Sequence, residues 1–304
     1  MKKSLLLFST ILSCWVAQAQ QESVFTQYFN NMQAVNPAYV GSRGTFTVTG
    51  LHRSQWTGIE DAPRTQTLTM NTPIYNENFG LGVAIMNDQI GPIGSTIMNV
   101  DLAGRIRVSQ NAYLSGGIKI GLNFFRANIT ALDLNNPSDP YFSQNVSSTL
   151  PNIGAGLYYY TPKFYLGVSI PRIVSNQLAD GDLVLGEGRE RRHYYFTAGA
   201  RFRLSEEWEM QPMALVYFPE RATTTFNVSD MFIFNEKLWL GAGWRWKESI
   251  HFAVGYNLLP ELRAMYSYDF LIGDLQPYSN GSHEISLTYD LPFSSDRIQN
   301  PRYF

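Results

Sequence analysis

Apolar and polar residues alternate along many short stretches of this chain. The clearest examples are residues 99–108, 193–204, 237–246, 262–270 and 283–291. Because successive side chains of a β-strand point to opposite faces of its sheet, each stretch predicts a strand with one apolar and one polar face. About fourteen such stretches follow one another, separated by turn-forming residues. The pattern therefore predicts an all-β chain.

The connectors between these predicted strands are in turn long and short. The long ones are Arg53–Pro63, Asp88–Gly94, Arg126–Pro151, Pro171–Arg192 and Gly273–Gly281. The short ones are Val108–Asn111, Thr161–Lys163, Ser205–Glu207, Asn235–Lys237 and Leu258–Glu261. In an up-and-down sheet every second connection lies at the same end, and outer-membrane barrels have short periplasmic turns and long surface loops. We predict a transmembrane antiparallel β-barrel of about fourteen strands, of the outer-membrane type, running from near Thr45 to near Leu291. The alternative is a soluble all-β protein.

The N-terminus has the features of a secretory signal peptide, which we assign to residues 1–19. Met1–Lys3 is basic, Leu5–Leu12 is apolar, and Ala17–Ala19 is a small-x-small cleavage site. The apolar run is too short to span a bilayer. A lipoprotein signal at Cys14, the only cysteine of the chain, is the alternative.

Residues 20–44 differ from the barrel that we expect over residues 45–304, which includes a C-terminal tail. They are polar and rich in asparagine, and they include Asn36-Pro37, so a strand across lipid is not expected there. Three placements stay open from the sequence: a plug inside the barrel, a segment docked at its periplasmic mouth, or an ordered lead-in to the first strand.

The composition supports a barrel in the outer membrane and argues against nucleic-acid binding. Charged residues make up only 16% of the 304 residues, although hydrophobic residues make up 44% and aromatic residues 14%. Soluble domains carry about 25% charged residues. Dispersed apolar positions with many aromatic residues suit a lipid-facing band with two aromatic girdles. A net charge of −2 gives no basic footprint for nucleic acid.

The chain shows no arrangement typical of an enzyme or of a cofactor or metal site. The four histidines are scattered, and Gly-x-Gly pairs fall inside strands rather than before helices. The charges on the polar strand faces are instead expected to line the lumen and to pair with one another. We expect Asp269 to pair with Arg263, and Glu284 or Asp290 with Arg245. The predicted lumen charges are Asp101, Arg105, Lys119, Arg201, Arg203, Arg245, Arg263, Asp269, Glu284 and Asp290.

A series of short motifs, in order along the mature chain, gives a family resemblance. The motifs are Phe25–Tyr28, Asn36–Ser42, Arg53–Gly58, Ala62–Thr67, Asn87–Pro92, Tyr266–Asp269, Gly281–Tyr289 and Asn300–Phe304. Together they resemble the PorP/SprF family of outer-membrane proteins of the type IX secretion system in Bacteroidota. The resemblance implies a role in the secretion or surface anchoring of proteins, gliding adhesins among them, whose C-terminal signal domains direct them to this system. It also implies periplasmic partners from the secretion complex.

The expected function is therefore a barrel that holds a secreted partner protein, and an outer-membrane porin or solute channel is the alternative. We expect the long loops to face the cell exterior and to contact the partner, the short turns to face the periplasm, and the apolar band to contact outer-membrane lipid. Aromatic and arginine residues are favoured at protein interfaces. The candidate contact residues are Tyr141, Phe142, Arg189, Arg191 and Arg192.

Overall fold

A computed structural model describes residues 24–74, 78–131, 144–176, 190–220 and 223–291 of the chain. These residues form one antiparallel sheet whose strands follow the chain order. Its strands are β1 (Phe46–Ser54), β2 (Arg64–Ile74), β3 (Phe79–Ile90), β4 (Ile93–Ser109), β5 (Ala112–Ala127), β6 (Val146–Tyr160), β7 (Phe164–Ile170), β8 (His193–Ala200), β9 (Phe202–Arg203), β10 (Trp208–Pro219), β11 (Thr225–Phe234), β12 (Leu238–Arg245), β13 (Ser249–Leu259), β14 (Leu262–Leu271) and β15 (Ser282–Leu291).

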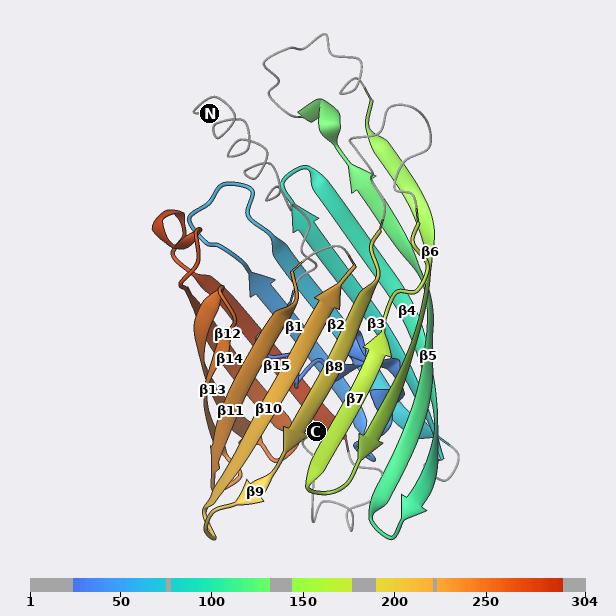
Figure 1. Cartoon of the computed structure of the whole chain (residues 1–304), viewed down its shortest axis with the longest axis vertical. Coiled ribbons are helices and arrows are strands. Elements are labelled where there is room, and N and C mark those ends of the chain that lie inside the picture. The colour runs from blue at the N-terminus through green and yellow to red at the C-terminus, as the bar shows by residue number, and fades with distance from the viewer. Residues whose placement is uncertain (1–23, 75–77, 132–143, 177–189, 221–222, 292–304) are drawn as a thin grey trace, which may run out of the picture.

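The sheet closes on itself. β1 pairs with β15 from Phe46–Leu291 to Ser54–His283, so the first and last strands leave no free edge. β8 and β9 both pair with β10 and form one strand interrupted at Arg201, so the fifteen segments make a barrel of fourteen strands. Figure 1 shows this tilted barrel. The predicted fold, with its start near Thr45 and its end near Leu291, is confirmed.

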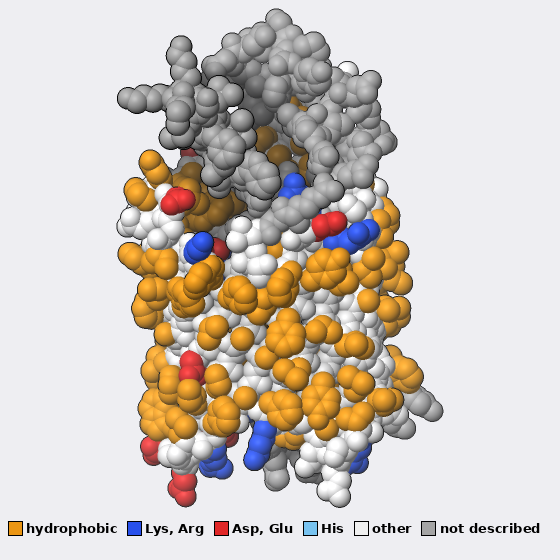
Figure 2. All heavy atoms as spheres, in the orientation of Figure 1, with side chains coloured by type: hydrophobic (Ala, Val, Ile, Leu, Met, Phe, Trp, Pro, Cys, Tyr) orange, Lys and Arg blue, Asp and Glu red, His pale blue; other side chains and the backbone are white. Residues whose placement is uncertain are grey.

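The side chains of the strands separate into an inner and an outer set. Buried and exposed positions alternate along most strands, as in β2 and β15. The outward positions carry large apolar side chains such as Val100, Ile120 and Leu287, which are about half exposed. On the face drawn in Figure 2, hydrophobic side chains form an apolar band, with most charged side chains above and below it. This is the surface that a barrel presents to lipid.

The two ends of the barrel differ in the length of their connections (Figure 1). The long-loop end carries the β1–β2, β5–β6, β7–β8 and β14–β15 links, whereas tight turns join β4 to β5 and β11 to β12 at the tight-turn end. The predicted long link Asp88–Gly94 is wrong. β3 and β4 stay paired up to Ile90–Ile93, so only Gly91 and Pro92 remain between them. The β12–β13 link at the same end is also short.

Helical structure in the described residues is sparse. It consists of α2 (Met32–Val35) and the 3₁₀ turns η2 (Pro37–Tyr39), η3 (Ile129–Ala131) and η5 (Gln276–Tyr278). Among the described residues, no helix is both long and apolar enough to cross a membrane.

Cysteine labelling tests the orientation of the barrel, since Cys14 is the only cysteine of the chain. Glu60 is exposed in the β1–β2 link, and Ser205 is exposed in the turn before β10. We expect an impermeant maleimide to label Glu60→Cys on intact cells, because long loops face outward. Ser205→Cys should react only after the outer membrane is permeabilised. The reverse labelling pattern would mean that the tight turns face the exterior.

Candidate functional site

Residues 24–44, which we call the lumen segment, lie inside the barrel. All but Val24, Ala34 and Gly44 of these residues are buried. Residues 26 and 27 bond to side chains at the long-loop end of β14 and β15, whereas Gly41 bonds to Arg105 near the tight-turn end. The segment therefore runs through the lumen from the long-loop end to the tight-turn end, where β1 begins.

Four charged side chains from four strands converge on the start of the lumen segment, and we call them the charge cluster. They are Arg53 on β1, Arg245 on β12, Asp269 on β14 and Glu284 on β15, each with at most 1% of its surface exposed. Arg53 donates to Asp269 Oδ2 at 2.8 Å and to Glu284 Oε2 at 2.9 Å. Arg245 Nη1 lies 3.5 Å from Asp269 and 2.8 Å from Glu248, which is partly exposed.

The lumen segment completes this charge cluster. The backbone N–H groups of Thr26 and Gln27 donate to the two oxygens of Glu284, at 3.0 and 2.7 Å. The Thr26 hydroxyl donates to Asp269 and accepts from both Arg53 and Arg245. Two carboxylates and two guanidinium groups are thus neutralised and hydrogen-bonded in the same place. This matters because a buried charge without partners is strongly destabilising.

A second set of polar contacts lies midway along the lumen. Gln33 Nε2 donates to Asp101 Oδ2 at 3.0 Å, and Lys119 Nζ lies 3.5 Å from Asp101 Oδ1. The same Lys119 ammonium donates to the carbonyls of Gln33 and Ala34 at 3.2 and 3.3 Å. β4, β5 and the lumen segment are thereby joined through one ion pair.

A third set holds the segment at the tight-turn end. Arg105 donates to the carbonyls of Gly41 and Val40, at 2.5 and 3.3 Å. Arg43 lies 2.5 Å from Asp290 at the end of β15. Because these partners come from β4 and β15, the segment is anchored to distant parts of the wall.

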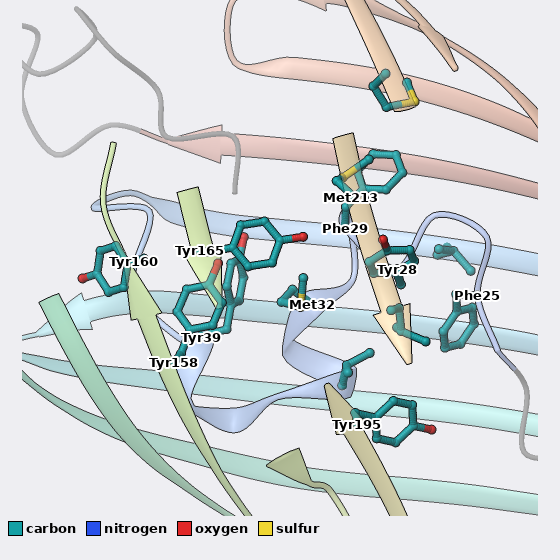
Figure 3. Close-up of a cluster of buried hydrophobic side chains, with 14 of the residues drawn as sticks. Phe25, Tyr28, Phe29, Met32, Tyr39, Tyr158, Tyr160, Tyr165, Tyr195 and Met213 are labelled. Atoms are coloured by element: carbon teal, nitrogen blue, oxygen red, sulfur yellow. The ribbon is translucent and has the colours of Figure 1, made fainter. Parts of the chain in front are cut away.

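Between these polar anchors the segment packs against apolar side chains of the wall (Figure 3). Tyr28, Phe29 and Met32 belong to the same buried cluster as Tyr165 on β7 and Met213 on β10. Tyr39 meets Tyr158 edge to face, with ring centroids 5.7 Å apart. Aromatic pairs of this kind contribute about 0.5–1.5 kcal/mol beyond their buried area.

Glycines on the wall let the segment approach the strands closely. A Cβ on Gly117 of β5 would lie 2.4 Å from the backbone N of Ala38, and one on Gly80 of β3 would lie 2.0 Å from the carbonyl oxygen of Val40. No side chain fits at such distances, so the wall here must be glycine for η2 and the following residues to sit against it.

The predicted lumen charges fall into two groups. Eight of the ten, namely all but Arg201 and Arg203, contact the lumen segment or one of the ion pairs above; the eight are Asp101, Arg105, Lys119, Arg245, Arg263, Asp269, Glu284 and Asp290. Arg201 pairs with Glu209 of β10 near the tight-turn end. Arg203 is exposed and donates to the carbonyls of Ser205 and Glu206, so it lies outside the lumen, contrary to expectation.

The expected pairings within this set are wrong. Asp269 and Glu284 both pair with Arg53, and Asp290 pairs with Arg43. Arg263 donates to Asn30 at 2.7 Å and lies over the ring of Trp239, 4.4 Å from its centroid. The pairing depends on which strands meet at closure and on a segment whose place the sequence left open.

Arg53 lies in β1, although the sequence pattern predicts it at the start of a loop. β1 continues to Ser54, and Arg53 is paired with Glu284 on one side and Thr65 on the other. The signal that would have found it is its even spacing from the inward residues Thr47, Thr49 and Leu51.

The β7–β8 link is described only at its two ends. Glu190 in this link is buried and accepts hydrogen bonds from Asn123 on β5 and from Asn176, both at 2.6 Å. Arg192 donates to the carbonyl of Ile173 at 2.7 Å. Arg191 is half-buried. The candidate contact residues Tyr141, Phe142 and Arg189 lie outside the described residues.

Ser229, His251 and Asp269 are the residue types of a Ser-His-Asp catalytic triad, but they are not bonded to one another as a triad is. Ser229 Oγ lies 2.9 Å from His251 Nε2, and His251 is the cross-strand partner of Asp269. His251 Nδ1, however, has no hydrogen-bond partner, and Asp269 is bound by Arg53 and Thr26 instead. In the described part of the chain, no group of three or more His, Cys, Asp or Glu residues is placed to hold a metal ion.

Comparison with known families decides the family of the chain. The family model described as "Type IX secretion system membrane protein PorP/SprF" matches residues 17–289. The chain belongs to the PorP/SprF family. It is thus a β-barrel protein of the bacterial outer membrane and of the type IX secretion system. A search of curated proteins finds no match.

Solved structures resemble this PorP/SprF barrel at low sequence identity. A Pseudomonas aeruginosa FadL homologue is 14% identical, with a TM-score of 0.46, covering 85% of this chain and 93% of its own. The CymD monoaromatic hydrocarbon channel is 11% identical, with a TM-score of 0.49, over 89% and 94%. The NanC porin is 11% identical, with a TM-score of 0.43, over 81% and 100%.

Substitutions at the neighbouring glycines Gly116 and Gly117 test whether close contact with the wall holds the lumen segment in place. Gly117→Val should displace the lumen segment, because the new side chain would overlap the backbone of Ala38. Gly116→Val should be tolerated, since its Cβ meets only Leu157 at 3.7 Å. Trypsin should then cut after Arg43 in purified Gly117→Val barrels but not in Gly116→Val or wild type, as read by mass spectrometry. Equal protection of Arg43 in both variants would show that the contact does not hold the segment.

Removing Arg53 should leave the buried carboxylates of Asp269 and Glu284 with Arg245 as the remaining arginine of the charge cluster. We expect Arg53→Met to lower the free energy of unfolding by about 3–5 kcal/mol, as for other broken buried ion pairs, measured by urea unfolding in liposomes. Adding Glu284→Gln should recover part of the loss, because it removes one unpaired carboxylate. Arg203→Met, at an exposed position, is the control and should change stability by less than about 0.5 kcal/mol. A loss no larger than in this control would contradict the assigned role of the charge cluster.

Proposed function

We propose that this PorP/SprF barrel supports the secretion or surface anchoring of a partner protein, such as a gliding adhesin, by holding that protein rather than by passing small solutes. The partner would carry the C-terminal signal domain of type IX substrates, and periplasmic components of the secretion complex would bind at the tight-turn end. The family membership supports the secretion context. The position of the lumen segment inside the barrel supports the distinction from a porin.

The packing of the lumen segment is the observation that carries the proposal. Its contacts reach β1, β4, β5, β12, β14 and β15, and its side chains are almost all buried. A porin needs a continuous aqueous path lined by polar side chains. Here the inward charges bond to the segment or to one another, so few are left to line such a path. The barrel is therefore suited to be a rigid support.

The long loops are the proposed contact surface for the partner. Tyr141, Phe142, Arg189, Arg191 and Arg192 supply aromatic and arginine side chains of the kind that dominate interfaces. Glu190 also ties the end of the β7–β8 link to β5, and Arg192 bonds to Ile173 at the other end of the same link. A test of the link must leave these two residues in place.

Replacing residues 180–189 with a Gly-Ser linker of the same length tests this proposal in the native organism. We expect normal insertion of the barrel, seen as a heat-modifiable gel shift, but loss of surface display of the partner protein. Replacing the exposed residues 274–276 of the β14–β15 link in the same way is the control, and it should preserve display. In planar bilayers the wild type should show no steady conductance, and deletion of residues 24–43 should open a conducting pore. Normal display after the 180–189 replacement, together with steady wild-type conductance, would favour a porin.

A further inference from the structure

One acidic residue interrupts the lipid-facing surface. On the face drawn in Figure 2, an acidic side chain lies within the apolar band. Among the described strand residues that point outward, Asp230 of β11 is the one carboxylate with apolar neighbours on every side. Along its own strand these are Val228 and Phe232, and directly across from it are Pro212 of β10 and Ala242 of β12.

Asp230 lies far from both membrane surfaces. It follows the start of β11 by five residues and precedes its end by four. At about 3.3 Å per residue along a tilted strand, its carboxylate lies roughly 10 Å from each edge of a band that is about 25 Å tall. Lipid head groups at the edges of the band are therefore out of its reach.

The Asp230 carboxylate accepts backbone hydrogen bonds from Met231 and Gln211, but no basic side chain of the described residues pairs with it. Asp230 is half-buried, and its Oδ1 is inaccessible and has no hydrogen-bond partner. Charged groups on the lipid face destabilise a barrel most near the middle of the bilayer. An ionisable residue in that position marks a functional site, and its partner is expected to be a group of opposite charge.

The surface around Asp230 suits close approach by another protein. The directly paired neighbours, Pro212 and Ala242, are small, and Ala214 and Ala198 continue this set of small side chains across β10 and β8. Small residues let a second polypeptide come close within a membrane. Beside them the outer wall is hollowed by an apolar cavity of about 760 Å³, whose lining includes Val216, Phe218 and Phe226.

We propose that Asp230 and the small residues around it form a lateral docking site, in the plane of the membrane, for a different outer-membrane protein that presents a lysine or arginine from its own lipid-facing wall. Charge complementarity fixes the chemistry of this partner. A second copy of the chain does not fit, because the outward Arg64 and Arg126 lie at the long-loop ends of β2 and β5 rather than at the depth of Asp230. The site lies on the outer wall and does not depend on the function proposed above.

Photo-crosslinking in the native organism tests the site. A photoreactive amino acid at Ala242 should crosslink to one outer-membrane protein, and the crosslinked strand of that protein should carry an outward lysine or arginine. The same amino acid at Val100, an outward residue of β4, is the matched control and should give no such product. Crosslinks only to lipid, only to further copies of this chain, or to a partner without a basic residue at the contact would overturn the proposal.

The dependence on charge is the decisive readout. Asp230→Asn and Asp230→Leu should each lower the crosslink yield by about tenfold or more, whereas Asp274→Asn, in an exposed loop, should not change it. Asp230→Lys should abolish the crosslink, and exchange of the partner's basic residue for aspartate should restore it. The gel shift of the purified Asp230→Leu barrel should be normal, because a leucine at this position suits lipid better than a carboxylate does. An unchanged yield in a folded Asp230→Leu barrel would refute the site.

Discussion

Closure of the sheet is the constraint on which the rest of the structure depends. Inside a membrane each backbone N–H and C=O group needs a partner within the protein, and the pairing of β1 with β15 along the whole of β1 removes the last free edge. Closure with fourteen strands also creates an interior. Eight strands leave a lumen that their own side chains can fill, whereas sixteen to eighteen leave an aqueous channel. A barrel of fourteen strands lies between these sizes, and residues 24–44 lie buried in its interior.

The wall and the lumen segment satisfy each other's polar groups. Asp269 and Glu284 carry charges that the strands neutralise through Arg53 and Arg245, but the oxygens of Glu284 also accept the N–H groups of Thr26 and Gln27. Those N–H groups belong to a stretch without a sheet or a long helix to bind them. The segment is therefore ordered by the charges of the wall, and its presence lets those charges be buried.

The features that depend on a single strand could be predicted from the sequence. The strand ends and the ion pairs could not, because they depend on contacts between segments that are distant along the chain. Period-two alternation identified the strands, the inward face and the number of strands, because each is a local property. Arg53 was assigned to a loop, and the short link at Gly91 and Pro92 was taken for a long one, since strand ends follow from pairing with neighbours. The ion pairs were beyond reach for a related reason. They join β1, β12, β14 and β15 through a segment whose position the sequence left open.

Asp230 is a strand position that breaks the alternation, and the lateral docking site is proposed there. A sequence consistent at every level specifies its fold, and departures from that consistency are expected at functional sites. The alternation accounts for a charged residue on the inner face. Asp101, for example, pairs with Lys119 and accepts a hydrogen bond from Gln33. The alternation does not account for Asp230, where the same rule requires an apolar residue. Because the lumen is occupied, the surfaces left for partners are the two ends and the lipid face, and Asp230 distinguishes one side of that face from the rest.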